Sequence, residues 1–102
     1  MFDLKITKEA NKDIDDIVSY ISKTLKNPIA ASNFFDDFEK SCETIVANPE
    51  AYEYCGDSRL KQAGYRKIVI KNYIVFYRIN KPENTVYIMR VIYGRRDYIN
   101  LI

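Results

Sequence analysis

Histidine and tryptophan are absent from this chain of 102 residues, and glycine occurs only three times. Without histidine, a serine or cysteine nucleophile has no imidazole base beside it. The three glycines are isolated from one another, so the sequence has no glycine-rich loop to hold a phosphate group. Protein zinc sites need histidines or several thiolates, and the sequence offers neither. We therefore expect no bound metal and no cofactor.

Cysteine is scarce as well, and the two that occur, Cys42 and Cys55, form no CxxC pair. This pattern predicts two reduced thiols in a cytoplasmic protein. Cys42 falls on the apolar stripe of a predicted helix, so we expect it in the core. Cys55 falls in a predicted loop, and a disulfide remains the alternative there.

Long apolar runs are missing too. A membrane-spanning helix needs a run of about 18 or more apolar residues, and the sequence has none. The N-terminal segment carries Asp3 and lacks the apolar stretch of a secretory leader. A length of 102 residues with 47% hydrophobic content predicts one domain, residues 1–102, with a modest core.

Charge is distributed unevenly, although the net charge is only +2. Residues 1–58 contain six lysines and twelve acidic residues, a balance of −6. Residues 59–102 contain ten lysines and arginines but only two acidic residues, a balance of +8. All six arginines lie in this second part. This split predicts a basic surface in the C-terminal half that meets an acidic partner.

The N-terminal half alternates between strand and helix patterns. "FDLKIT" places apolar side chains at every second position, which predicts a half-buried strand. Thr7 follows as a predicted helix cap. Apolar residues then recur at helical spacing in residues 10–25 and again in residues 31–46. Asn27-Pro28 separates the two stripes and Asn48-Pro49 ends the second, so we expect an antiparallel helical hairpin.

The C-terminal half is rich in β-branched and aromatic residues. Residues 49–64 show no periodicity and predict a long loop with at most one turn of helix. Three strands are expected at Tyr65–Ile70, Tyr73–Ile79 and Thr85–Tyr93, joined by two hairpins. The element order β-α-α-β-β-β predicts an α+β fold: an N-terminal strand and an antiparallel three-stranded meander in one sheet, packed against the helical hairpin. The final eight residues fit either a short helix or an extended tail.

The candidate functional residues belong to the strands and the tail. Arg78 and Arg90 interrupt apolar strands, where a charge is costly unless it is exposed or paired. Because these strands are expected to be neighbours, the two arginines should approach each other and repel unless an anion binds between them. Guanidinium groups favour phosphates and carboxylates, and tyrosine rings stack on bases. We expect one cationic binding patch formed by Arg66, Lys67, Arg78, Arg90, Arg95, Arg96 and Tyr98.

The acidic residues of the helices have a simpler interpretation. Asp13, Asp15 and Asp16, and the pair Asp36 and Asp37, are predicted to lie on solvent-facing sides of the two helices. Acid–base catalysis by paired carboxylates requires a concave, partly buried site. We expect these residues to be solvated surface.

The stretches "YIVFYRI" at Tyr73–Ile79 and "RVIYGRRD" at Arg90–Asp97 resemble the RelE/ParE superfamily of bacterial toxins. Members commonly have an aromatic strand of the form YVIFYRV, and a later strand that ends in RVLHGxRD. The helical hairpin and its Asn-Pro ends are similar too, so the resemblance covers nearly the whole chain. It implies the toxin of a type II toxin–antitoxin, or plasmid stabilisation, system. The cognate antitoxin, encoded beside the toxin, would form a hetero-oligomer with it in the bacterial cytoplasm.

Two activities occur in this superfamily. ParE-like members inhibit DNA gyrase, with no known catalytic residues. RelE-like members cut mRNA on the ribosome, using basic residues and a tyrosine. Lys67 and Arg96 match two of those basic positions, and Tyr98 stands near the position of the tyrosine, which corresponds to about Ile102. Ile74 stands where a ribonuclease has arginine, and losing one such group costs on the order of 100-fold in rate.

The resemblance therefore favours a gyrase inhibitor over a ribonuclease, and a degenerate relative or a basic nucleic-acid-binding module is the third alternative. We expect the antitoxin to bind as a segment that folds on the toxin and covers apolar helix or sheet surface. The +8 balance of residues 59–102 predicts that this segment is acidic.

Overall fold

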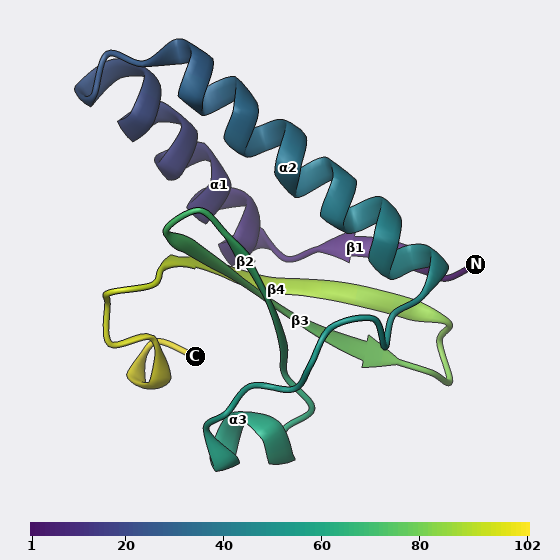
Figure 1. The fold of residues 1–102 in the computed structure, drawn as a ribbon. Coiled ribbons are helices and arrows are strands. Elements are labelled where there is room, and N and C mark those ends of the chain that lie inside the picture. The colour runs from purple at the N-terminus through teal and green to yellow at the C-terminus, as the bar shows by residue number, and fades with distance from the viewer.

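A computed structural model describes all of residues 1–102 and shows a four-stranded sheet. Two long helices cover one face of this sheet (Figure 1). A shorter helix and the C-terminus lie on the other side of the sheet (Figure 1). No helix has the length and apolar content needed to cross a membrane. The elements in chain order are β1 Asp3–Ile6, α1 Lys8–Ser19, a π-helical turn η1 Tyr20–Thr24, α2 Pro28–Ala47, α3 Ser58–Gln62, β2 Arg66–Ile70, β3 Tyr73–Asn80, β4 Thr85–Tyr93 and a 3-10 turn η2 Tyr98–Asn100.

The helix boundaries follow the predicted caps. The Thr7 hydroxyl accepts a 3.1 Å hydrogen bond from the Ala10 amide at the start of α1. The Asn27 side chain accepts a 3.0 Å bond from the Ala30 amide at the start of α2, where Pro28 is the first helical residue. Both caps satisfy amides that have no partner inside the helix. The predicted helical hairpin is confirmed.

The sheet has the strand order β1-β4-β3-β2. The last three strands form the predicted antiparallel meander, and β1 pairs parallel to β4 at one edge. The sequence predicted that the first strand joins the sheet without indicating its neighbour. The pairing of β3 with β4 has one irregularity: Tyr77 pairs with Ile88 but Phe76 pairs with Arg90, which makes Met89 the extra residue of a β-bulge.

The main core lies between the sheet and the hairpin of α1 and α2. It contains 16 buried residues, among them Phe34, Tyr77 and the predicted core residue Cys42. A second, smaller cluster lies on the opposite face and consists of Cys55, Leu60, Phe76 and Ile92. Both cysteines are free and buried.

The predicted loop, residues 49–64, contains the single short helix α3, capped by the Asp57 side chain. Leu60 of α3 and Cys55 of the loop are buried against the face of the sheet that α1 and α2 leave uncovered. Tyr98 and Ile102 of the C-terminal tail pack against the same cluster. The tail therefore forms a 3-10 turn that packs on the sheet, which resolves the two alternatives left by the sequence.

Candidate functional site

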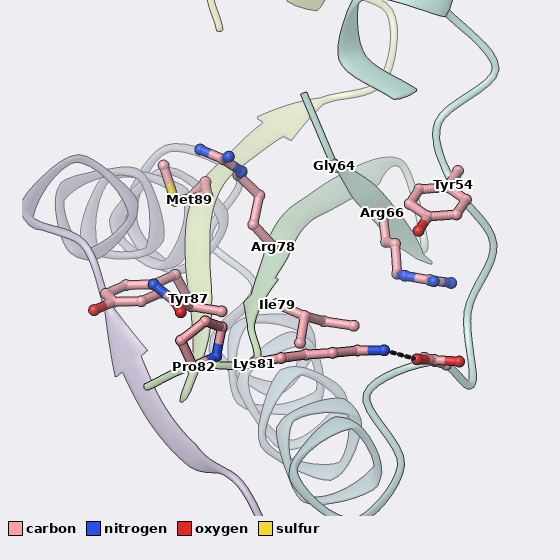
Figure 2. Close-up of a pocket in the computed structure, with 11 residues that line it drawn as sticks. Tyr54, Gly64, Arg66, Arg78, Ile79, Lys81, Pro82, Tyr87 and Met89 are labelled. Carbon is pink, nitrogen blue, oxygen red and sulfur yellow. Dashed lines mark ion pairs between the residues drawn. The ribbon is translucent and has the colours of Figure 1, made fainter. Parts of the chain in front are cut away.

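Two of the predicted arginines, Arg66 and Arg78, line a groove beside the C-terminal end of β3 (Figure 2). Its volume is about 630 Å³, and we call it the cationic groove. Its lining comes from the loop before α3, the start of β2, the end of β3 and part of β4. The lining residues are Glu50, Tyr54, Gly64, Arg66, Arg78, Ile79, Asn80, Lys81, Pro82, Tyr87 and Met89.

Arg66 is partly engaged within the protein. One of its guanidinium nitrogens donates a 2.7 Å hydrogen bond to the Tyr52 carbonyl, and the group lies 4.0 Å above the Tyr54 ring. A guanidinium group has five N–H donors, so most of those of Arg66 stay available. Stacking on the ring fixes the plane of the group without consuming them.

Arg78 has no acidic partner in the structure. Its guanidinium carbon lies 5.4 Å from the centre of the Tyr65 ring, and the side chain is exposed. A β-carbon added at Gly64 would lie 3.9 Å from Arg78 Nε, so the chain passes close to the arginine at this turn. Figure 2 shows Arg78 directed toward Met89, away from Arg66. The two arginines thus flank the end of β3 from opposite faces of the sheet.

Lys81 supplies the third cation of the groove, and it is paired. Its ammonium group lies 3.0 Å from a carboxylate oxygen of Glu50, and both side chains are largely exposed. The contact lowers the pKa of Glu50, through the hydrogen bond and the charge of Lys81. Figure 2 shows this ion pair extending from the end of β3 to the loop on the other side of the groove.

Arg90 has a different role from the one predicted. It makes two hydrogen bonds of 2.7 and 3.1 Å to the Asp13 carboxylate, and the side chains are only 24% and 16% exposed. The Val91 amide also donates to Asp13, at 2.9 Å. The bond to Asp13 raises the pKa of Arg90. The prediction that Asp13 is solvated surface is therefore wrong, because Asp13 joins α1 to the edge of β4.

Arg78 and Arg90 do not meet across the sheet. Arg78 lies opposite Tyr87, whereas Arg90 lies opposite Phe76 beyond the bulge at Met89. The expected repulsion between the two guanidinium groups is absent, and Asp13 rather than a ligand compensates the charge of Arg90. The prediction of one continuous patch is wrong for Arg90.

The remaining predicted residues lie outside the cationic groove. Arg95 and Arg96 are exposed in the turn after β4. Tyr98 packs against Phe76 with the ring centres 5.2 Å apart. Lys67 lies opposite Phe76 on β2, is half-buried and forms no ion pair. The face of the sheet that carries the tail thus holds both Lys67 and Tyr98 next to Phe76.

Arg59 is an arginine that the sequence reasoning did not single out. It donates from one guanidinium nitrogen to the Ile102 carbonyl at 3.2 Å and from the other to the Ile99 carbonyl. Arg90 adds a 3.1 Å bond to the Leu101 carbonyl. These two arginines hold the tail against the sheet through main-chain carbonyl groups. No sequence signal identifies such contacts, because any residue type presents the same carbonyl.

Comparison with known protein families identifies one that matches the chain. The model of the ParE toxin of the type II toxin–antitoxin system parDE matches residues 4–98. The chain is similar to a solved chromosomal ParDE toxin–antitoxin system from P. aeruginosa, with a TM-score of 0.69, 22% identity and coverage of 91% of this chain and 96% of that one. No curated protein sequence matches the chain.

Two solved RelE-type toxins share the fold. The RelBE2 toxin–antitoxin complex from Mycobacterium tuberculosis gives a TM-score of 0.62 at 17% identity, covering 90% of this chain and 96% of that one. The intact E. coli RelBE complex gives 0.61 at 16% identity, covering 94% and 100%. These likenesses establish the fold, and the family match extends over nearly the whole sequence. The chain belongs to the ParE toxin family of type II toxin–antitoxin systems, within the RelE/ParE superfamily.

Proposed function

We propose that this toxin arrests growth by inhibiting DNA gyrase in the bacterial cytoplasm, unless its cognate antitoxin is bound. The observation that carries the proposal is the apolar character of the sheet face that holds Lys67 and Tyr98, two of the three ribonuclease candidates. Phe76 and Ile92 are fully or almost fully buried there, and Ile74 and Tyr98 pack against them. Cleavage of a phosphodiester requires fixed charges where the transition-state charge develops, and the centre of this face is apolar.

The available cations fit a binding surface better than a catalytic site. Arg78, Arg95 and Arg96 are exposed and have no acidic partners. Arg66 and Lys67 are half-buried on β2, the strand next to that of Arg78. We assign contact with the target to these five residues and give Arg90 a structural role. The tail positions Arg95 and Arg96, because the contacts of Arg59 and Arg90 fix the segment that follows them.

A gyrase assay with the purified chain tests this proposal. The chain should block supercoiling and stabilise the DNA cleavage complex of the enzyme. An Arg95→Glu/Arg96→Glu double variant should lose at least about 10-fold in potency, because charge reversal at a contact surface lowers affinity. A Lys23→Glu variant alters an exposed cation on η1, away from this surface, and should act like the parent chain.

A ribosome-dependent ribonuclease is the second candidate, and one arrangement favours it. Lys67 and Tyr98 both lie next to Phe76 on one face of the sheet, and Arg96 lies two residues before Tyr98. Under this alternative, translated mRNA would be cut at fixed codon positions while gyrase stayed active. That result would reject the gyrase proposal. A chain that does not arrest growth when induced would be the inactive relative.

Exposed apolar surface supports the antitoxin as a partner. A second groove of about 720 Å³ lies between β1, α1 and α2, and Phe2, Leu4 and Phe35 contribute to it. Phe35 is 42% exposed. Asp15, Glu39 and Glu43 also line this groove, and their charge disfavours nucleic acid. A protein segment with an apolar face is the occupant that we propose here.

A further inference from the structure

Part of the edge of β3 has no neighbouring strand. β3 spans Tyr73–Asn80, but β2 pairs only with Tyr73–Tyr77. β2 begins at Arg66, and the chain before it turns away at Gly64, which has a φ of +87°. The edge of residues 78–80 therefore stays open on the side where β2 would continue. Ile79 and the two flanking residues line the cationic groove at this position.

The backbone groups of Ile79 point to this open side. In an antiparallel pair, every second residue directs its N–H and C=O to a given neighbour. The two-residue turn between β2 and β3 makes Ile70 and Tyr73 the first bonded pair. The residues of β3 whose backbone groups point to the side of β2 are then Tyr73, Val75, Tyr77 and Ile79. No hydrogen bond made outside the helices and strands involves Ile79.

Positive charge flanks this open edge on both faces of the sheet. Arg66 pairs with Tyr77 and shares its side, whereas Arg78 is the next residue along β3 and lies on the opposite side. A strand added beside Ile79 would also direct successive side chains to opposite faces. Two consecutive acidic residues in that strand would therefore meet the two arginines, one on each face.

We propose that the open edge of β3 binds an extended, acidic segment of the antitoxin as a short additional strand, with its backbone bonded to Ile79 and two consecutive carboxylates paired with Arg66 and Arg78. Charge complementarity identifies the occupant: the three cations of the groove face one acid, Glu50. This inference rests on the proposed antitoxin partnership. The bound segment also withdraws Arg66 and Arg78 from the target, which links binding to neutralisation.

Glu50 acts as an internal competitor for the segment. Its carboxylate holds the Lys81 ammonium group at 3.0 Å beside the open edge, and both side chains are largely exposed. Exposed ion pairs of this kind break easily. A carboxylate of the partner replaces Glu50 at Lys81 when the segment binds. Glu50→Gln frees Lys81 and should increase the affinity for the antitoxin by about 2- to 5-fold.

Amide hydrogen exchange of Ile79 tests the inference directly. The ¹⁵N-labelled full chain is compared alone and in its purified complex with the protein encoded beside it. The Ile79 amide should exchange at least about 10-fold more slowly in the complex, because it gains a hydrogen bond. A complex in which Ile79 exchanges at the free rate overturns this inference and leaves the antitoxin partnership intact. If no complex forms, the partnership itself fails.

Charge variants provide the second measurement. Arg78→Glu should weaken antitoxin binding by about 10-fold or more, and the loss should shrink at high salt. Arg78 makes no internal ion pair, so this variant should fold normally. Lys23→Glu is the matched control and should bind like the parent chain. Equal affinity of the Arg78→Glu and control variants overturns the inference, as does protection of Ile79 by a short single-stranded DNA but not by the antitoxin.

Discussion

The two faces of the sheet are built in different ways. The face under α1 and α2 buries 16 residues in one continuous core. The opposite face buries four, and loop residues, α3 and the tail cover them. Apolar burial is the dominant favourable term in folding, so the helix face supplies most of the stability. The opposite face and its margins carry the exposed arginines Arg78, Arg95 and Arg96, which suits a surface that binds other molecules.

Arg78 and Arg90 show the same contrast between single residues. Both interrupt apolar strands, and from the sequence they look equivalent. Arg90 is bound to Asp13 and to the tail, so it connects α1, β4 and the C-terminus. Arg78 contacts only an aromatic ring and stays exposed. One arginine therefore belongs to the scaffold, and the other is free to bind a ligand.

The largest expected effect comes from the helix face. Phe34 is 2% exposed and packs edge-on against Tyr73, with ring centres 5.2 Å apart. Phe34→Ala should lower the free energy of unfolding by about 3–5 kcal/mol, since it removes buried area and leaves a cavity. Urea denaturation followed by circular dichroism measures this loss. Phe35→Ala, at an exposed neighbour on the same helix, should cost far less; equal losses would contradict the assignment of the core.

The next effect separates the two strand arginines. Arg90→Met leaves Asp13 partly buried without its cation, and should lower the free energy of unfolding by about 2 kcal/mol, less than the ~3–5 kcal/mol typical of fully buried pairs. Arg78→Met should change it by less than about 0.5 kcal/mol, as is usual for surface substitutions. Both values come from urea denaturation at neutral pH. Equal effects would remove the distinction between scaffold and binding arginines.

The difference between these arginines shows where sequence reasoning succeeds. Alternating and helical periodicities predicted the first strand and the two long helices, because apolar side chains must share a face. The richness in β-branched and aromatic residues predicted the last three strands. Caps such as Thr7 and Asn27 fixed the helix starts, because their side chains bond to amides a few residues away. Information of this kind is local. It allowed the fold class and the meander to be predicted correctly.

Long-range pairing limited the prediction of the site. Asp13 and Arg90 are 77 residues apart, and their contact depends on how α1 crosses the end of β1 and the edge of β4. The bulge at Met89 separates Arg90 from Arg78 by changing the register of the strand pairing. No residue type in that stretch predicts the bulge. The open edge beside Ile79 exists only because β2 starts late. These features arise from tertiary geometry that one sequence does not reveal.

Tyr77 tests the helix face through its pH dependence. Burial raises the pKa of Tyr77 from its ordinary value of 10.0 to about 12, and its hydroxyl donates to the Pro49 carbonyl at 2.8 Å. Above pH 10 the unfolded chain loses this proton before the folded chain does. Its contribution is therefore complete below pH 10 and is lost as the pH rises toward 12.

Tyr77→Phe should cost about 1 kcal/mol at pH 8 through the lost hydrogen bond. It should also flatten the decline in stability between pH 10 and 11, as measured by urea denaturation at each pH. Cys42, whose pKa burial raises to about 11, and Tyr73 contribute to the remaining slope. Tyr54→Phe, at an exposed tyrosine in the loop before α3, is the matched control. If the free energy of unfolding of Tyr77→Phe declines with pH as steeply as that of the parent chain, Tyr77 has the same pKa in the folded and unfolded states.

The smallest effect concerns the opposite face. Arg59 holds the tail only through the Ile99 and Ile102 carbonyls, and these contacts are exposed. Arg59→Ala should therefore lower the global free energy of unfolding by no more than about 1 kcal/mol. Amide exchange should accelerate for residues of the tail and of α3 but stay unchanged in α2, because these regions open separately. Acceleration of equal size in α2 would mean that the two faces unfold as one unit. It would contradict the conclusion that the two faces differ in stability.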